Sequence, residues 1–192
     1  MLESIGMITS KPTTEKRAMQ EDNHDTTQAI GKTMMIIAWI IALGLLVAFF
    51  TYWESNAYNP NQTPNSQQSS TENIVVLQRN RYHHYVTQGA INTAEVTFLL
   101  DTGATDVVIP EHIANNLGLP KGNRQQALTA NGIITVYDTR LAQLTIGDIT
   151  LNKVNASINP AMKNDEILLG MSALKSIEFT QRGDQLTLKQ YR

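Results

Sequence analysis

The apolar positions of the chain follow two different patterns. From Met34 to Trp53, twenty consecutive positions carry no charged residue. As an α-helix rising about 1.5 Å per residue, this stretch covers roughly 30 Å, the thickness of the hydrocarbon core of a bilayer. We therefore predict one transmembrane helix at residues 34–53. A cleaved signal peptide is the alternative, with a weak small-residue site at Ser55 and Ala57, although the apolar region of a signal peptide usually spans about 7–15 residues behind a short basic start.

The basic residues near this helix predict its orientation. Lys16, Arg17 and Lys32 precede the helix, whereas residues 54–73 contain neither Lys nor Arg. Because Lys and Arg close to a span tend to stay in the cytoplasm, the N-terminus is predicted to be cytoplasmic. The part of the chain after the helix is then extracytoplasmic. In a Gram-negative bacterium the helix would cross the inner membrane, and this part would face the periplasm.

Over residues 74–192 the apolar residues occur in short runs separated by turn signals, the pattern of an all-β sandwich or barrel. The runs are IVVL at 74–77, VTFLL at 96–100, DVVI at 106–109, IITVY at 133–137, LTI at 144–146, ILL at 167–169 and LTL at 186–188. Asn131 and Gly132 suit a tight hairpin turn because both tolerate positive φ. Short helices are predicted at Pro110–Leu117 and Met171–Lys175.

The remaining stretches are polar. Residues 1–33 show no sustained apolar periodicity, which predicts a disordered cytoplasmic tail. Residues 54–73 are rich in Asn, Gln, Ser and Pro, a composition that predicts a flexible linker. The expected order is therefore tail, transmembrane helix at 34–53, linker, and an all-β domain at 74–192.

Charge and cysteine content exclude several classes of function. The formal net charge is only −2, so the chain lacks the basic field that attracts nucleic acid, and we predict no DNA or RNA partner. The absence of cysteine excludes a thiol nucleophile and Cys-based zinc sites. His83 and His84 are adjacent on a predicted strand, so their side chains face opposite ways and cannot share one metal ion. We expect no metal and no other cofactor.

One carboxylate stands out from this background. Asp101 interrupts two apolar runs, where an unpaired buried charge is costly, and it begins the triplet Asp101-Thr102-Gly103. Gly103 lets the backbone turn sharply or approach another chain, and the Thr102 hydroxyl can bond across such a contact. The triplet makes Asp101 the candidate catalytic residue.

Its surroundings resemble a known family. The block FLLDTGATDVVI at 98–109 resembles the active-site loop of retropepsin-like aspartic proteases. About 65 residues later, ILLG at 167–170 and MSAL at 171–174 are similar to the apolar-apolar-Gly signature and the helix that follow in that family. Residues 128–133 look like its hairpin flap. The helix at 34–53 looks like the membrane-anchored bacterial branch, and the implied fold is the closed acid-protease barrel.

The resemblance assigns roles to particular residues. It implies catalytic roles for Asp101, Thr102 and Gly103. It implies substrate contacts for Ala104, Thr105 and Asp106 in the loop, and for Ala130, Asn131 and Gly132 at the tip of the flap. A membrane-anchored aspartic endopeptidase acting on peptides or proteins is the function that follows.

The triplet occurs once, and this predicts a homodimer. Aspartic proteases use two carboxylates that share one proton, because close like charges cannot both ionise. A two-fold dimer would place both copies of Asp101 on its axis. One would activate a water molecule while the other hydrogen-bonds the scissile carbonyl, and since the pair titrates together, activity is expected to be favoured below neutral pH.

Two other functions remain open at this point. The first is a catalytically silent module on the same fold that binds peptides or acts as a scaffold, because a fold does not guarantee activity. The second is a structural envelope protein whose β domain only resembles a protease. Cleavage of peptides that depends on Asp101 would distinguish the enzyme from both.

Overall fold

The computed structural model describes the backbone of residues 14–129 and 132–192, and the side chains within those ranges from residue 31 onward. The chain divides into two compact units, Met1–Tyr52 and Trp53–Arg192. Each unit is described by itself.

A single long helix, α1 (Thr14–Tyr58), contains the predicted apolar segment. Its part from Gly31 to Tyr58 is long and apolar enough to cross a membrane. The helix begins well before the apolar segment, so the prediction of a disordered tail is wrong for residues 14–33. Glu, Lys, Arg, Ala and Gln in this stretch are good helix formers, and extending an existing helix avoids the cost of nucleation. Residues 1–13 lie outside the described part.

The predicted linker is also structured. Residues 54–58 complete α1, and strand β1 (Asn65–Gln68) follows. Between them the side chain of Asn61 is 3% exposed, donates to the carbonyl oxygens of Gln78 (2.9 Å) and Val86 (2.7 Å), and accepts from the Gln78 amide (2.7 Å). The prediction of a flexible linker over 54–73 is therefore wrong, because polar side chains in this segment hydrogen-bond to backbone groups of neighbouring strands.

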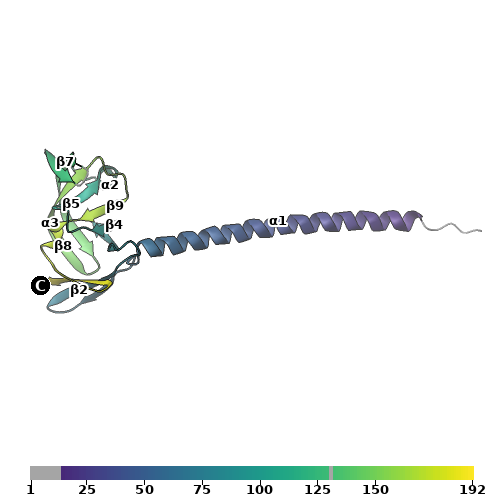
Figure 1. The fold of residues 1–192 in the computed structure, drawn as a ribbon, viewed down its shortest axis with the longest axis horizontal. Coiled ribbons are helices and arrows are strands. Elements are labelled where there is room, and N and C mark those ends of the chain that lie inside the picture. The colour runs from purple at the N-terminus through teal and green to yellow at the C-terminus, as the bar shows by residue number, and fades with distance from the viewer. Residues whose placement is uncertain (1–13, 130–131) are drawn as a thin grey trace, which may run out of the picture. The chain divides into compact units, whose positions relative to one another are not determined.

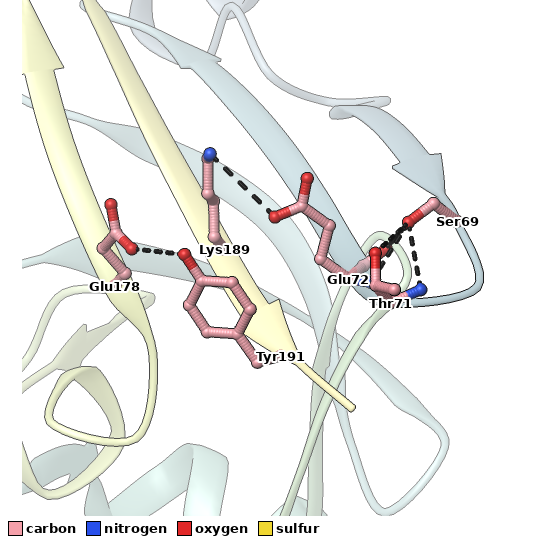
Figure 2. A network of polar contacts seen from close by, with 6 residues as sticks. All are labelled: Ser69, Thr71, Glu72, Glu178, Lys189 and Tyr191. Carbon is pink, nitrogen blue, oxygen red and sulfur yellow. Dashed lines mark hydrogen bonds and ion pairs between the residues drawn. The ribbon is translucent and has the colours of Figure 1, made fainter.

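A small antiparallel sheet joins the two ends of the second unit (Figure 1). Its order is β1 (Asn65–Gln68), β2 (Glu72–Gln78), β11 (Gln185–Tyr191) and β10 (Glu178–Arg182). Figure 2 shows the polar contacts along this sheet. The Tyr191 hydroxyl donates to Glu178 Oε2 (2.7 Å), and this hydrogen bond raises the pKa of Tyr191. Lys189 lies 3.9 Å from Glu72, whose carbonyl oxygen accepts from Ser69 Oγ (3.0 Å).

A larger sheet of seven strands closes on itself. The strands are β3 (Val86–Ile91), β4 (Ala94–Leu100), β9 (Glu166–Leu169), β5 (Val107–Pro110), β8 (Ile149–Asn159), β7 (Gly132–Ile146) and β6 (Arg124–Thr129), in that spatial order. Pairing of β3 with β7 closes the barrel, which confirms the predicted all-β closed fold. Within it β4 pairs in parallel with β9, and β5 pairs in parallel with β8.

The core is built from alternate residues of these strands. Phe98, Ile109, Leu144, Ile158 and Leu169 are fully buried. The two predicted short helices are present as α2 (Glu111–Asn116) and α3 (Met171–Leu174). Since α3 follows β9 directly, it lies beside the loop that carries Asp101, as the contacts below show.

Candidate active site

Asp101 lies in the loop between β4 and β5, at the point where two barrel strands separate. Its amide donates to the carbonyl oxygen of Leu169 (3.2 Å), which joins the loop to the end of β9. The Gly103 amide donates to Asp101 Oδ1 (2.9 Å), and the Ala104 amide to the Asp101 carbonyl oxygen (3.2 Å). The carboxylate is partly exposed and is held by the turn of its own loop.

The start of α3 forms the back of this loop. The amides of Met171 and Ser172 donate to the carbonyl oxygens of Ala104 and Thr105, both at 2.8 Å. Gly170 fits here because a Cβ at this position would lie 2.1 Å from the Asp106 carbonyl oxygen. The sequence signature Ile-Leu-Leu-Gly therefore reflects close backbone contact with the loop.

Ser172 is a residue that sequence reasoning missed. Its Oγ accepts a hydrogen bond from the Val107 amide (2.9 Å) and donates to the Asn155 carbonyl oxygen (2.7 Å). These two hydrogen bonds connect α3 to the first residue of β5, the strand that follows the Asp101 loop, and to β8. A hydroxyl residue two places after the glycine was the only signal for this role in the sequence.

A cleft of about 620 Å³ lies between the Asp101 loop and the hairpin of β6 and β7. From the loop it is lined by Asp101, Gly103, Ala104, Thr105 and Asp106. From the hairpin it is lined by Gln125, Gln126, Ala127, Leu128, Thr129, Ile134 and Val136. The structure therefore brings the candidate catalytic residue and the predicted flap to one cleft.

Two of the remaining predicted site residues, Thr102 and Gly132, are not among the residues that line this cleft. Thr102 is exposed, and its hydroxyl makes no hydrogen bond to residues 31–129 or 132–192. Gly132 begins β7 and has φ of 109°, in the region that favours glycine. Ala130 and Asn131 lie outside the described residues.

The hairpin ends in exposed apolar side chains. Thr129 pairs with Gly132 and Leu128 with Ile133 in the antiparallel register of β6 and β7. Leu128 is 85% exposed and Ile133 is 67% exposed. Large apolar side chains at a hairpin tip suit contact with an apolar surface or with a ligand in the cleft.

A second cavity of about 430 Å³ borders the cleft. The two share Asp106, Gln125 and Ser157. The second cavity is also lined by Asp138 and Arg140, which the sequence did not single out. The second cavity is therefore a neighbour of the cleft, lined by residues of β7 and β8.

Comparison with known proteins identifies this arrangement. Residues 87–176 match the family model described as gag-polyprotein putative aspartyl protease. The fold matches the crystal structure of a retropepsin-like aspartic protease from Rickettsia conorii, with a TM-score of 0.55 and 24% identity over 65% of this chain and 98% of that one. The β domain has the retropepsin-like fold, and its residues 87–176 are similar to aspartyl proteases of this kind. The matched residues run from β3 to just beyond α3 and include the loop, the hairpin and Gly170 of the retropepsin-like domain.

Two further matches were found. A protein described as an uncharacterized protein in the cobV 5′ region of Sinorhizobium sp. is 28% identical over 167 residues, which cover 80% of this chain and 72% of the relative. The EIAV protease complexed with the inhibitor HBY-793 matches with a TM-score of 0.40 and 20% identity, over 50% of this chain and 89% of that one.

Proposed function

We propose that the protein is a membrane-anchored aspartic endopeptidase that hydrolyses peptide bonds through a water molecule activated by a pair of Asp101 side chains. The observation that carries this proposal is the position of Asp101. It is partly exposed in a cleft of about 620 Å³, opposite a hairpin with exposed apolar residues, in a domain with the retropepsin-like fold.

The second carboxylate would come from a second copy of the chain. Each chain carries one Asp-Thr-Gly triplet, whereas the reaction needs two carboxylates that share a proton. A two-fold axis beside Asp101 would supply both. The exposed Thr102 hydroxyl is suited to bond the partner's loop, which would fix the distance between the two carboxylates.

Each group in the cleft then has a part in the reaction. One Asp101 carboxylate takes a proton from the water, whose oxygen bonds to the scissile carbonyl carbon, and this proton then passes to the peptide nitrogen as the C–N bond breaks. The protonated Asp101 of the other chain donates a hydrogen bond to the carbonyl oxygen. The Gly103 carbonyl oxygen accepts from the peptide backbone, and the hairpin excludes bulk water when it closes over the bound peptide.

The membrane helix adds a means of assembly. Confining two domains to one bilayer raises their effective concentration without any new contact. We infer that a weakly dimerising domain becomes active through this local crowding. In the proposed topology the N-terminus is cytoplasmic and the protease domain is extracytoplasmic, since basic residues precede the apolar segment 34–53 and residues 54–73 contain none.

The test compares the full chain with Asp101→Asn, both reconstituted in lipid vesicles and offered a peptide library at mildly acidic pH. The proposal predicts cleavage by the wild type and none by the variant. Equal cleavage by both proteins, or none by either, would contradict it. Peptide binding without cleavage by both would indicate the silent binding module.

A further inference from the structure

A basic and aromatic loop lies against the C-terminal end of α1. The loop, residues 80–84, connects β2 to β3. Asn80 Nδ2 donates to the Tyr58 carbonyl oxygen (2.9 Å), and the rings of Tyr58 and Tyr82 have centroids 6.3 Å apart. Arg81 Nη2 lies 3.8 Å from Glu54 Oε1. The loop is thus in contact with the residues that directly follow the apolar segment.

The residues that this loop contacts follow the apolar segment closely in the sequence. Glu54 and Tyr58 are one and five residues beyond Trp53, the last residue of the uncharged stretch. At about 1.5 Å per residue, Tyr58 is no more than roughly 8 Å from that end along the helix. A headgroup layer is about 5–8 Å thick on each side of the hydrocarbon core. If residues 34–53 cross the bilayer, this short length of chain keeps Tyr58, and the loop that contacts it, within reach of the lipid headgroups.

The loop is held in one conformation from within. Asn80 is 6% exposed, and its Oδ1 accepts from the amides of Tyr82 (2.9 Å) and His84 (3.0 Å). The His83 amide donates to the Asn80 carbonyl oxygen (3.1 Å), and His83 has a positive φ of 65°. Positive φ is uncommon for a residue with a side chain, so these hydrogen bonds maintain a conformation that the chain would otherwise avoid.

The side chains that this conformation exposes share one chemistry. Tyr82 is 50% exposed, the Arg81 side chain is 40% exposed, and His83 and His84 are exposed. The Arg81 guanidinium lies 4.8 Å from the centre of the Tyr82 ring. Arginine and histidine donate to phosphate oxygens, and tyrosine prefers the interface between lipid and water. Residues 78–94 contain no Asp or Glu.

The ion pair between Arg81 and Glu54 does not prevent Arg81 from binding phosphate. The Glu54 side chain is 74% exposed, and exposed ion pairs contribute little free energy. Arg81 can therefore exchange Glu54 for a phosphate group. By contrast, a separate cavity beside Tyr58 is lined by Glu95, Asp165 and Glu166, which phosphate would repel.

We propose that Arg81, Tyr82, His83 and His84 form a headgroup-binding loop that contacts the phosphate groups of phospholipids and holds the protease domain on the bilayer surface. The proposal rests on the membrane part of the proposed function. It does not depend on catalysis, so its outcome can be separated from that of the protease proposal.

The absence of cysteine allows a direct test on the full chain. A single cysteine is introduced as His83→Cys and labelled with an environment-sensitive fluorophore. The labelled chain is placed in phosphatidylcholine nanodiscs. These contain a fatty acid with a nitroxide near the headgroup, which quenches a fluorophore close to it. The matched control is Asn123→Cys, at an exposed position before β6. We expect severalfold stronger quenching at position 83 than at position 123. Equal quenching at the two positions would overturn the proposal.

Two further arms test the phosphate contact itself. Adding Arg81→Ala and Tyr82→Ser to the labelled chain, or replacing the phospholipid by a galactolipid without phosphate, should reduce quenching at position 83 toward the control value. Quenching that is unchanged in both arms would show that the tether alone brings the loop close, and would overturn the proposal. The label should respond in the same way in an Asp101→Asn background, whatever the outcome of the cleavage assay.

Discussion

At the scale of single residues, the candidate site depends on backbone groups more than on side chains. The Asp101 loop is held by hydrogen bonds from the Met171 and Ser172 amides, and by close contact with Gly170. The Ser172 hydroxyl is the one side chain of α3 that bonds the strands around the loop. Small residues at the start of α3 therefore position a carboxylate that they do not touch.

Ser172→Ala should lower both stability and activity. Removing the hydroxyl leaves the partly buried Val107 amide without its partner, a cost of about 1–3 kcal/mol. Urea unfolding should show this loss, and peptide cleavage should fall mainly through kcat because the loop loses its support. The control is Ser176→Ala, at an exposed position just after α3. If the two variants behave alike in both assays, Ser172 does not position the loop.

Gly170→Ala should destabilise the domain more than an ordinary glycine substitution. The new Cβ would lie 2.1 Å from the Asp106 carbonyl oxygen, so the loop or α3 has to move. Gly183→Ala is the comparison, because that position has positive φ (59°) and no atom within 4 Å of its Cβ. Conformational strain there should cost about 1 kcal/mol. Thermal unfolding of both variants measures the difference, and an equal cost would argue against the close contact.

At the scale of elements, the segment between α1 and β2 is the main departure from expectation. Its composition predicted a flexible linker, yet Asn61 bonds to both neighbouring strands and β1 adds to the small sheet. Polar residues look alike in a sequence whether they are solvated or bonded to backbone groups. The linker prediction failed for that reason.

Asn61→Ala should therefore be costly, although it lies in a polar stretch. The substitution removes three hydrogen bonds and leaves the buried carbonyl oxygen of Val86 unsatisfied, at a cost of about 1–3 kcal/mol, together with part-buried backbone groups of Gln78. Asn65→Ala makes the same change at an exposed position of β1. Chemical denaturation should separate the two clearly. A free linker would tolerate both substitutions equally.

The hairpin should affect activity and not stability. Leu128 and Ile133 are mostly exposed, so Leu128→Ser with Ile133→Ser removes little buried area and should change the free energy of unfolding by less than about 1 kcal/mol. If the hairpin closes over the peptide, KM should rise or kcat should fall severalfold. The matched control is Thr180→Ser on the exposed strand β10. Wild-type kinetics in the double variant would contradict a flap function.

How far the elements could be predicted depended on their apolar runs. Strands β2, β4, β5, β7, β9 and β11 each contain a run that the sequence marked, and these strands build most of the barrel core. Almost every residue of strand β6 is exposed. In β8 the apolar residues are interrupted by Asn residues and by Lys153, which has positive φ. Neither strand therefore shows a clear alternation of apolar and polar residues in the sequence. The Asp101 loop was predictable because its motif is local, whereas Ser172 and Asn61 act through distant partners.

At the scale of the whole molecule, the chain combines an apolar helix with a retropepsin-like domain that carries one Asp-Thr-Gly triplet. Because each chain supplies one Asp-Thr-Gly aspartate, the other half of the proposed catalytic pair has to come from another chain. In the proposed function the helix helps the domain to dimerise, because confinement to one bilayer raises the effective concentration of domains that are inactive as monomers. The central claim is that the active site is shared between two chains.

Mixing wild type with Asp101→Asn tests this claim most directly. The two proteins are combined in detergent at varied ratios and constant total amount, allowed to exchange, and reconstituted together before peptide cleavage is measured. A pair containing one Asn should be inactive because it lacks the second carboxylate. The account predicts that activity falls with the square of the wild-type fraction. Activity proportional to the wild-type fraction would show that each chain works alone, and would contradict a shared site.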